Sequence, residues 1–586
     1  MVTHRVRTAI ASAVERFGSP AVLLATVWVS DFLHSRDFGL YEDDFTFIPQ
    51  AITMDLAELT KFIGSYLVHL YGHGRPLSDS LISLFSFLGW RIAGLAGIYL
   101  IGYSIVALNV FLFYSILRRR GSEFAALAGG LAFALFPADT TQPFLTHSLG
   151  LQPSLTFLLL ATLAYLSGRR TAAYLLALGS LFCYETVFPV FLAVPLLTGR
   201  YDRGMARELL RHALLGGVML TAAVVLRWIV GETRVAGLEF PAVLLTPIRH
   251  VAVGPLVTLG TYFLRPFQAI GALSTEILVL TALGLLAYFA QLNRSRAEPA
   301  VMAHAPLRQL IKGGLRSLFS DSQDSAAPIR REMQLLCSGL AMLLLAYPLT
   351  FNIRSFSISG RDTRVHLAAV IGSSLLVAGL VSLVTHFIDS KRGRRVITLL
   401  LATWLSLLLA FGLTVQGDYV RAWQAQQAFW SELVHLIPDS PEGTVILIEP
   451  AGLRDFEQIG ANTWNLPRLL DQIYQFPPDW EEPPRVFRLV PGWQERIGGP
   501  DGMFSLIEQT VTAPPSLYRE VFSGDAILIE TTSGRLTRRT AALALDEASF
   551  PLKPESSPSH LAQSPGFLYP LLLDHLGPPE LYLLDG

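Results

Sequence analysis

The chain has 586 residues, of which 51% are hydrophobic and only 16% are charged, and its formal net charge is −1. This much apolar sequence, gathered in repeated long runs, exceeds what the core of a soluble domain needs and excludes an ordinary soluble protein. The two cysteines, Cys183 and Cys337, lie inside apolar runs, so neither a disulfide framework nor a cysteine-based metal site is supported. We therefore expect a polytopic α-helical membrane protein.

Short clusters of Lys and Arg separate the apolar runs and orient them, because such clusters collect in cytoplasmic loops. Three arginines precede the first run, at 20–35, which has no small-residue cleavage site and indicates a retained anchor with a cytoplasmic N-terminus. A second cluster, at 118–120, is also expected to be cytoplasmic, so one span at 94–117 returns to it. Residues 36–93 are thus predicted to form a first outer loop.

The same rule orients the rest of a predicted transmembrane domain, residues 1–415, in the plasma (inner) membrane. Further spans are expected at 123–140, 149–166, 171–198, 211–230, 272–291, 333–351, 365–387 and 396–415. Because basic residues flank both ends of the run 171–198, we expect two short spans hinged near Tyr184-Glu185. Residues 292–332 form a predicted cytoplasmic loop, and about eleven spans in all leave the C-terminus outside.

Residues 416–586 are Pro-rich and charged, and they predict a small extracytoplasmic α/β domain. Its helical pattern runs from Tyr419 to Leu436. Runs typical of β-strands follow at 444–449, 485–490 and 525–530. The tripeptide Thr532-Ser533-Gly534 predicts a hairpin that turns the last of these runs back onto the segment from Arg535. The domain has no phosphate-binding or dinucleotide-binding glycine motif and no HExxH, so a structural cap or recognition surface is the simplest interpretation, and no nucleic-acid partner is expected.

Three consecutive carboxylates, Glu42-Asp43-Asp44, open the first outer loop. Clustered negative charge at a membrane surface is costly, so these residues indicate a chemical role more than a folding role. Carboxylates in such a loop can accept a proton from a nucleophilic hydroxyl or hold a divalent cation through their oxygens. The alternative is a solvated loop, or a loop in which Asp44 caps the amphipathic stretch at 45–70.

Downstream in the same loop, the motif His73-Gly74-Arg75-Pro76 predicts a rigid turn. The turn presents the guanidinium group of Arg75, which suits bidentate binding of a phosphate. An interfacial anchor is the alternative for this arginine.

Another group of arginines lies in the predicted outer loop between 351 and 365. Its members are Arg354, Arg361 and Arg364. Three guanidinium groups outside run against the positive-inside tendency, which favours an anionic ligand over an anchor. The scattered histidines His147, His250 and His366 indicate structural roles.

Two acidic residues outside the first loop complete the candidate site. Asp139 closes the run 123–140 on the outer face, where a helix-end charge explains it equally well. Glu185 lies within the apolar run 171–198, where a carboxylate indicates a functional site by default. Burial could instead leave Glu185 protonated and simply hydrogen-bonded.

The order of these features resembles the GT-C superfamily of integral membrane glycosyltransferases, which includes protein O-mannosyltransferases and the aminoarabinose transferases of lipid A. The resemblance rests on a first outer loop that opens with Glu42-Asp43-Asp44 and continues to Gly74-Arg75-Pro76-Leu77, before many spans and a soluble outer domain. It implies that Asp43 or Asp44 is the catalytic or metal-holding residue and that Asp139 corresponds to a second acidic position. The chain lacks the WWDYG signature of oligosaccharyltransferases, which favours a single-sugar transferase.

The activity that the resemblance implies is an inverting glycosyl transfer. A polyprenyl-phosphate-linked sugar would be the substrate, with its phosphate bound by Arg75 and the outer arginines. Asp43 or Asp44 would accept the proton of a hydroxyl on a glycan, lipid or protein acceptor. No cofactor is required, although Asp43, Asp44 and Asp139 have the oxygen ligands that Mg²⁺ or Mn²⁺ prefers. The alternatives are a lipid flippase or anion transporter, or an inactive relative that acts as a scaffold.

Overall fold

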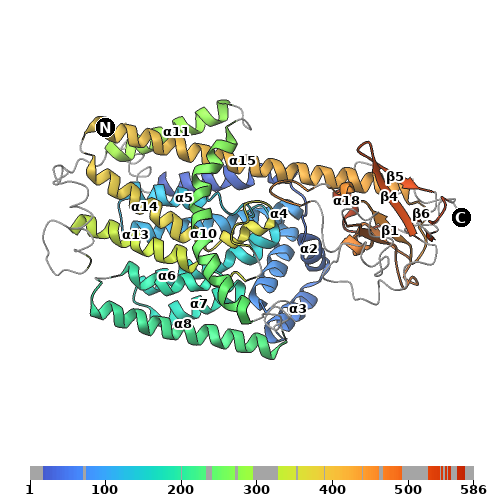
Figure 1. Cartoon of the computed structure of the whole chain (residues 1–586), viewed down its shortest axis with the longest axis horizontal. Helices are drawn as coiled ribbons and strands as arrows, with labels where there is room; N and C mark the ends of the chain where they lie inside the picture. Colours follow the sequence, from blue (N-terminus) through green and yellow to red (C-terminus); the bar gives the residue numbers. More distant parts are fainter. Residues whose placement is uncertain are drawn as a thin grey trace, which may run out of the picture. The chain divides into compact units, whose positions relative to one another are not determined.

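The computed structural model describes residues 18–69, 74–198, 201–231, 240–270, 275–294, 318, 327–351, 354–388, 390–438, 440–453, 455–460, 466–490, 526–540, 543–545, 548–550, 552–555 and 564–573. These residues are mostly helical, with a small region of β-sheet near the C-terminus (Figure 1). Their contacts divide the chain into two compact units. The helical unit comprises Met1–Arg36 and Met54–Gly417, and the C-terminal unit comprises Asp37–Thr53 and Asp418–Gly586. The predicted first outer loop is therefore divided between the two units.

Long apolar helices make up most of the helical unit. In chain order its elements are a helix at 18–27, η1 (Trp28–Phe32), α3 (Leu56–His69), α4 (Pro76–Arg118), α5 (Glu123–Ala134), η3 (His147–Leu151), α6 (Gln152–Leu166), α7 (Arg170–Cys183), η4 (Phe188–Leu197), α8 (Arg203–Ile229), α10 (Phe240–Ala269), α11 (Thr275–Arg294), α13 (Ala327–Leu345), η5 (Arg361–His366), α14 (Ala369–Phe387) and the first part of α15 (Lys391–Leu436). Within the described parts of the chain, five helices are long and apolar enough to cross a membrane: α4, the continuous η3–α6 segment, α8, α14 and α15. The eleven spans expected from the sequence, and their orientation, stay predictions.

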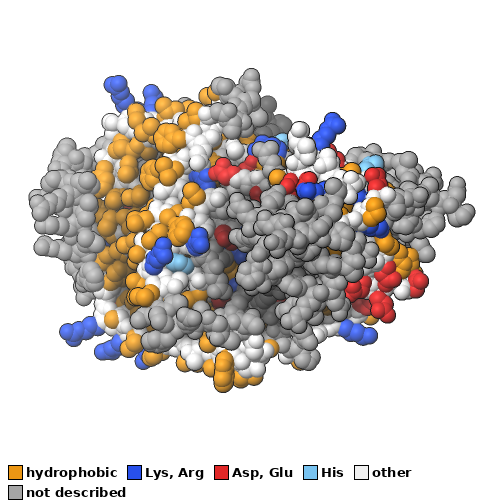
Figure 2. All heavy atoms as spheres, turned by 45° about the vertical axis from the view of Figure 1, so that its right-hand side comes forward, with side chains coloured by type: hydrophobic (Ala, Val, Ile, Leu, Met, Phe, Trp, Pro, Cys, Tyr) orange, Lys and Arg blue, Asp and Glu red, His pale blue; other side chains and the backbone are white. Residues whose placement is uncertain are grey.

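The surface of the helical unit is apolar along whole helices. On α8, Leu214, Val218 and Trp228 are 62%, 67% and 70% exposed. On α10, Leu256 and Phe267 are 71% and 72% exposed. Figure 2 shows hydrophobic side chains gathered over a broad part of one face, with Lys and Arg side chains along its margins. An apolar surface of this extent is what helices present to lipid, so these helices are compatible with a membrane protein.

Glycines allow close packing of α13 and α14, which lie side by side (Figure 1). A side chain on Gly372 of α14 would lie 2.4 Å from the backbone nitrogen of Leu343, and one on Gly339 of α13 would lie 2.9 Å from the carbonyl oxygen of Gly372. A side chain on Gly129 of α5 would likewise lie 2.7 Å from the methyl group of Ala378 on α14. Small residues at such crossings let helix backbones approach one another. The packing fixes the start of α14, which follows η5 after two residues.

Interruptions of the helical pattern place polar residues among the apolar helices. Residues 184–187 separate α7 from η4, so the predicted break near Tyr184-Glu185 is confirmed. The turns η1 and η3 are π-helical, a rare geometry that often occurs at functional sites. Both pack on α4 at Gly102, where a side chain would lie 2.8 Å from Ser148 Oγ of η3 and 3.8 Å from the ring of Phe32 of η1.

In the C-terminal unit a four-stranded sheet has the order β3-β1-β4-β5. The strands β1 (Val445–Ile448), β3 (Arg485–Arg488) and β4 (Ala526–Thr532) are parallel, and β5 (Arg535–Arg539) pairs antiparallel with β4. The three predicted strands are confirmed. The predicted hairpin is also confirmed, because Thr532 pairs with Arg535 and the two residues between them, Ser533 and Gly534, have φ of 53° and 80°, as a two-residue hairpin turn requires.

Short elements complete this unit. They are α2 (Asp44–Thr53), η6 (Pro450–Gly452), η7 (Leu466–Arg468), α16 (Leu470–Ile473), α18 (Tyr569–Leu572) and two small antiparallel pairs, β2 (Tyr474–Gln475) with β8 (Ser564–Pro565) and β6 (Leu543–Leu545) with β7 (Ala548–Phe550). The helical structure predicted at 396–415 and at 419–436 is confirmed, and α15 runs through both ranges without interruption. No proline occurs between its ends, so nothing in the backbone stops the helix where the composition changes.

Candidate functional site

The acidic residues Glu42, Asp43 and Asp44 form the turn that leads into α2. Asp44 is fully buried, and its Oδ2 accepts a hydrogen bond from the backbone nitrogen of Tyr41 at 3.2 Å. Glu42 has a left-handed φ of 40°, and its Oε1 accepts a hydrogen bond from the backbone nitrogen of Gly460 at 3.2 Å. Asp43 is half-buried. Asp44 is the first residue of α2, and its carboxylate binds the turn before the helix. The amphipathic stretch expected at 45–70 is divided into α2 and α3, so Asp44 does not cap it as one helix. Asp43 is the more accessible aspartate.

The segment before this turn is packed against the last part of α15, within the C-terminal unit. The Tyr41 hydroxyl donates a hydrogen bond to the carbonyl oxygen of Tyr419 at 2.8 Å, and the Gln426 amide donates one to the carbonyl oxygen of Leu40 at 3.2 Å. A side chain on Gly39 would overlap the ring of Trp423, so only glycine fits there. The acidic turn is thus part of a packed structure, and the alternative of a solvated loop is wrong.

In the helical unit, two arginines converge on one carboxylate. Arg75 donates hydrogen bonds from Nε and Nη2 to Glu185 at 2.9 and 2.6 Å, and Arg227 donates one from Nη2 at 3.1 Å. The guanidinium group of Arg75 also lies over the ring of Tyr184, 4.5 Å from its centre. The side chains of Arg75, Glu185 and Arg227 are only 12–18% exposed. We call these three residues the Arg75 cluster.

Three different elements position the Arg75 cluster. Arg75 precedes Pro76 at the start of α4, where proline favours the first helical turn. Glu185 lies in the break between α7 and η4, and Arg227 lies in the last turn of α8. Asp79, in the first turn of α4, adds a weaker electrostatic interaction with Arg75. The guanidinium groups of Arg75 and Arg227 therefore both contact the one carboxylate of Glu185.

A second polar cluster surrounds Asp139. The Asp139 side chain is 2% exposed, and its Oδ1 accepts hydrogen bonds from the backbone nitrogen and hydroxyl of Thr141 at 3.0 and 2.7 Å. Arg364 of η5 interacts electrostatically with Asp139 and donates a hydrogen bond from Nη1 to His147 Nε2 at 3.2 Å. Burial raises the pKa of Asp139 above its ordinary value, although the Thr141 hydrogen bonds and the charge of Arg364 oppose this shift. Together with Asp31, which interacts electrostatically with Asp139, these residues are called the Asp139 cluster.

The Asp139 cluster lies within electrostatic range of the Arg75 cluster in the helical unit. The side chain of His147 interacts electrostatically with Arg364, with Arg361 and, most weakly, with Arg75. The unit therefore brings together four predicted site residues, Arg75, Arg361, Arg364 and Asp139, and the contacts of Arg75 add Glu185 as a fifth.

A hydrogen-bond network around His366 holds the loop that presents Arg361 and Arg364. His366 is fully buried, its Nε2–H donates to the carbonyl oxygen of Ser357 at 2.9 Å, and its Nδ1 accepts from the Tyr347 hydroxyl at 2.8 Å. Burial lowers the pKa of His366 to about 4, although the bond to Ser357 opposes this shift. This histidine has the structural role predicted for it, since its ring nitrogens are both satisfied in the neutral state.

Other predicted residues lie elsewhere. Arg354 is exposed and lies 5.9 Å from the centre of the Phe356 ring, outside the contacts described for either cluster. His73 lies outside the described residues. Across the residues that the structure does describe, no group of three or more His, Cys, Asp or Glu side chains is arranged to hold a metal ion. The predicted divalent cation thus stays a prediction.

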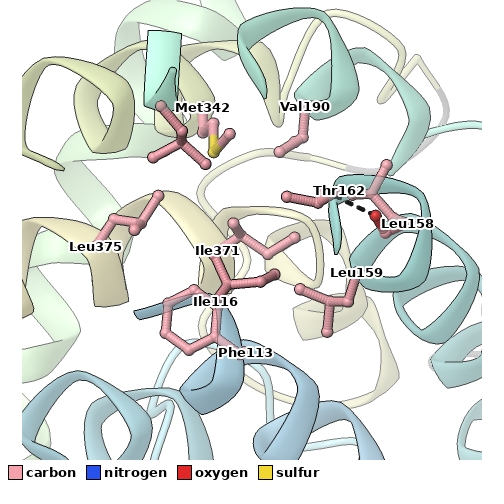
Figure 3. Close-up of a pocket in the computed structure, with 10 residues that line it drawn as sticks. Phe113, Ile116, Leu158, Leu159, Thr162, Val190, Met342, Ile371 and Leu375 are labelled. Atoms are coloured by element: carbon pink, nitrogen blue, oxygen red, sulfur yellow. Dashed lines mark hydrogen bonds between the residues drawn. The ribbon is translucent and has the colours of Figure 1, made fainter. Parts of the chain in front are cut away.

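An apolar pocket lies between α4, α6, η4, α13 and α14 (Figure 3). Phe113, Leu159, Val190 and Met342 are among its lining residues. Its one polar lining residue, Thr162, donates its hydroxyl to the carbonyl oxygen of Leu158 within its own helix at 2.9 Å. The pocket has no charged lining residue and is not the candidate site.

Sequence reasoning missed three residues of these clusters. Asp31 is an acidic residue inside the predicted first span, and Arg227 is a basic residue near the predicted outer end of the span 211–230. An ionisable residue within a span indicates a functional site, so both carried a usable signal. His147 carried none, because its contact with Arg364 joins segments 217 residues apart.

Comparison with protein-family models, with curated proteins and with solved structures gives no match. The geometry of the clusters and the resemblance seen in the sequence are therefore the grounds for a function.

Proposed function

We propose that the chain is an inverting glycosyltransferase of the GT-C type. It transfers a single sugar from a polyprenyl phosphate to a hydroxyl group on a glycan, lipid or protein acceptor. The helical unit crosses the plasma (inner) membrane, the N-terminus is cytoplasmic and the C-terminal unit is extracytoplasmic. The apolar helices, their exposed apolar surfaces and the arrangement of basic clusters along the sequence support this placement.

The Arg75 cluster is the observation that carries the proposal. Two guanidinium groups converge on one carboxylate among apolar helices, and Asp79 adds a weaker interaction with Arg75. Guanidinium groups held in this way suit bidentate binding of phosphate oxygens. A lipid-linked phosphate offers such oxygens from within the membrane. When the bond between the anomeric carbon and the phosphate oxygen breaks, the phosphate keeps the electron pair, and the arginines stabilise the charge that develops.

Asp43 is the proposed general base. The acceptor hydroxyl gives its proton to the Asp43 carboxylate while its oxygen attacks the anomeric carbon from the face opposite the phosphate, which inverts that carbon. Asp44 is unsuited to this task, because it is fully buried and accepts a hydrogen bond from the backbone of its own turn. Glu42 is likewise bound to the backbone of Gly460.

Separate substitutions of the two aspartates test the proposal. The full chain in lipid nanodiscs is supplied with polyprenyl-phosphate-linked glucose, galactose, mannose and arabinose and a crude glycan and lipid fraction, and the release of free polyprenyl phosphate is measured. We expect Asp43→Asn to lower turnover at least 100-fold with donor binding unchanged. Asp44→Asn should stay within about threefold of the unsubstituted protein, because an amide oxygen can still accept the Tyr41 hydrogen bond.

Two outcomes would contradict the proposal. Turnover that survives Asp43→Asn but not Asp44→Asn would make the buried aspartate the base. No transfer from any of these lipids, together with movement of the same lipids across vesicle bilayers, would favour the transporter.

A further inference from the structure

The Asp139 cluster contains buried polar atoms that no described residue satisfies. Asp139 Oδ2, Asp31 Oδ2, His147 Nδ1 and Arg364 Nε are all buried without a hydrogen-bond partner among the described residues. Asp139, His147 and Asp31 are only 2%, 3% and 9% exposed. An unsatisfied buried polar group is costly, and several in one cluster indicate that a ligand or ordered water completes them.

The chemistry of the unsatisfied atoms follows from the Arg364 contact. An arginine can only donate, so His147 Nε2 must accept the hydrogen bond from Arg364. In the neutral imidazole the proton then lies on Nδ1, which makes the unsatisfied Nδ1 a donor. Arg364 Nε–H is a second donor, whereas the carboxylate oxygens of Asp139 and Asp31 are acceptors.

The cluster is built on two unusual backbone turns. Asp31 lies in the π-helical turn η1, and His147 is the first residue of the π-helical turn η3. Both turns pack on the same part of α4, and the loop after Asp139 is tied to η5 by a hydrogen bond from the Thr140 backbone nitrogen to the Thr363 hydroxyl at 3.2 Å. The positions of the side chains are therefore fixed by the fold before any ligand binds.

The mixture of donors and acceptors selects the class of ligand. A phosphate offers only acceptors and would be repelled by the two carboxyl groups. A metal ion would be repelled by Arg364, which already uses the Nε2 of His147. A hydroxyl group both donates and accepts, so adjacent hydroxyls match a carboxylate on one side and an N–H on the other.

We infer that Asp139, His147 and Arg364, with Asp31 beside them, bind hydroxyl groups of the sugar on the lipid-linked substrate. This inference rests on the proposed function. It assigns the two clusters of the helical unit to different parts of one substrate. The Arg75 cluster binds the phosphate, and the Asp139 cluster binds the sugar. Arg364 thereby changes from the phosphate ligand expected from sequence to a sugar ligand.

The experiment compares binding of polyprenyl phosphate with binding of the same lipid phosphate carrying glucose, galactose, mannose or arabinose. The full chain in nanodiscs is used, and the ratio of the two dissociation constants is the sugar preference. Asp139→Asn keeps an oxygen for Thr141 and replaces the unsatisfied acceptor by a donor. His147→Gln keeps an acceptor for Arg364 but has no donor at the position of the imidazole Nδ1. We expect each to reduce the sugar preference at least 10-fold, with binding of the unglycosylated lipid phosphate within about twofold of the original.

His212→Gln is the matched control. His212 is 1% exposed, and both of its ring nitrogens have partners, the Tyr174 hydroxyl and the Phe191 carbonyl oxygen, each within 2.9 Å. Its substitution should leave the sugar preference unchanged, and binding of the unglycosylated lipid phosphate reports that each variant is folded.

The outcomes separate the inference from the proposed function. If the unsubstituted protein transfers sugar but Asp139→Asn and His147→Gln keep its sugar preference, the cluster holds only water and the inference is wrong while the proposed function stands. If the unsubstituted protein neither prefers nor transfers any of the four sugars, both are wrong.

Discussion

The two charged clusters of the helical unit differ in how completely they are satisfied. In the Arg75 cluster both oxygens of Glu185 accept hydrogen bonds from guanidinium groups. In the Asp139 cluster an oxygen of Asp139 and a nitrogen of His147 have no partner within the described structure. A paired cluster stabilises the protein before substrate arrives and holds its charges in place. An unpaired cluster lowers stability until a ligand supplies the missing hydrogen bonds.

The largest expected effect comes from breaking the paired cluster. Glu185→Gln removes the carboxylate charge that both arginines contact, so we expect the free energy of unfolding to fall by about 3 kcal/mol. Thermal unfolding of the full chain in nanodiscs measures this loss.

The control for this prediction is Glu208→Gln, which removes the ion pair between Arg170 and Glu208 in the same unit. Those side chains are 42% and 41% exposed, and an exposed pair contributes less than about 1 kcal/mol. Equal losses for Glu185→Gln and Glu208→Gln would show that the Arg75 cluster gains nothing from its burial.

Some features of the fold could be predicted from the sequence, and others could not. The break at Tyr184-Glu185 was predictable, because clusters of basic residues at both ends of one apolar run require the chain to turn back. The hairpin at Ser533-Gly534 was predictable because its turn residues determine the local backbone. Both signals lie within a short stretch of sequence.

The pairing of charges was not predictable, since it depends on which helices become neighbours. Glu185 and Arg227 belong to different predicted spans, and the sequence of neither span indicates that the two side chains are in contact. The roles of Asp43 and Asp44 could not be separated either, because the difference is that Asp44 is fully buried whereas the adjacent Asp43 is only half-buried. The sequence did not predict that α15 is one continuous helix. Its composition changes along its length, although helix-forming residues continue throughout.

The second prediction concerns His366, which holds the loop that presents Arg361 and Arg364. Its pKa in the folded protein is about 4, below its ordinary value of 6.5, so the unfolded chain binds a proton more readily than the folded one. The free energy of unfolding is therefore not reduced by His366 above pH 6.5, and it decreases as the pH falls from 6.5 towards 4. We expect a loss of about 2 kcal/mol between pH 7.5 and 5.

His366→Gln removes the titrating group, so its unfolding temperature should change less between pH 7.5 and 5 than that of the unsubstituted protein. Parallel changes in the two proteins would mean that His366 is not the group responsible.

The smallest expected effect has the opposite sign and lies in the unpaired cluster. The pKa of Asp139 is raised by burial, so its ionised form opposes folding, and this penalty grows as the pH rises through the raised pKa. Asp139→Asn keeps the Thr141 hydrogen bonds without a charge, and we expect it to stabilise the ligand-free protein by about 1 kcal/mol at pH 7.5. The gain should shrink as the pH falls, because the unsubstituted aspartate then becomes protonated. Thermal unfolding at a series of pH values measures the difference.

Asp139→Asn is informative because it should raise the free energy of unfolding while it weakens binding of the lipid-linked sugar. A carboxylate that only supported the fold would lower stability when it was replaced, as Glu185 should. A carboxylate kept for a ligand raises stability when it is replaced and weakens binding of the lipid-linked sugar. A fall in unfolding temperature for Asp139→Asn at pH 7.5 would therefore make the two clusters alike and would remove the distinction between them.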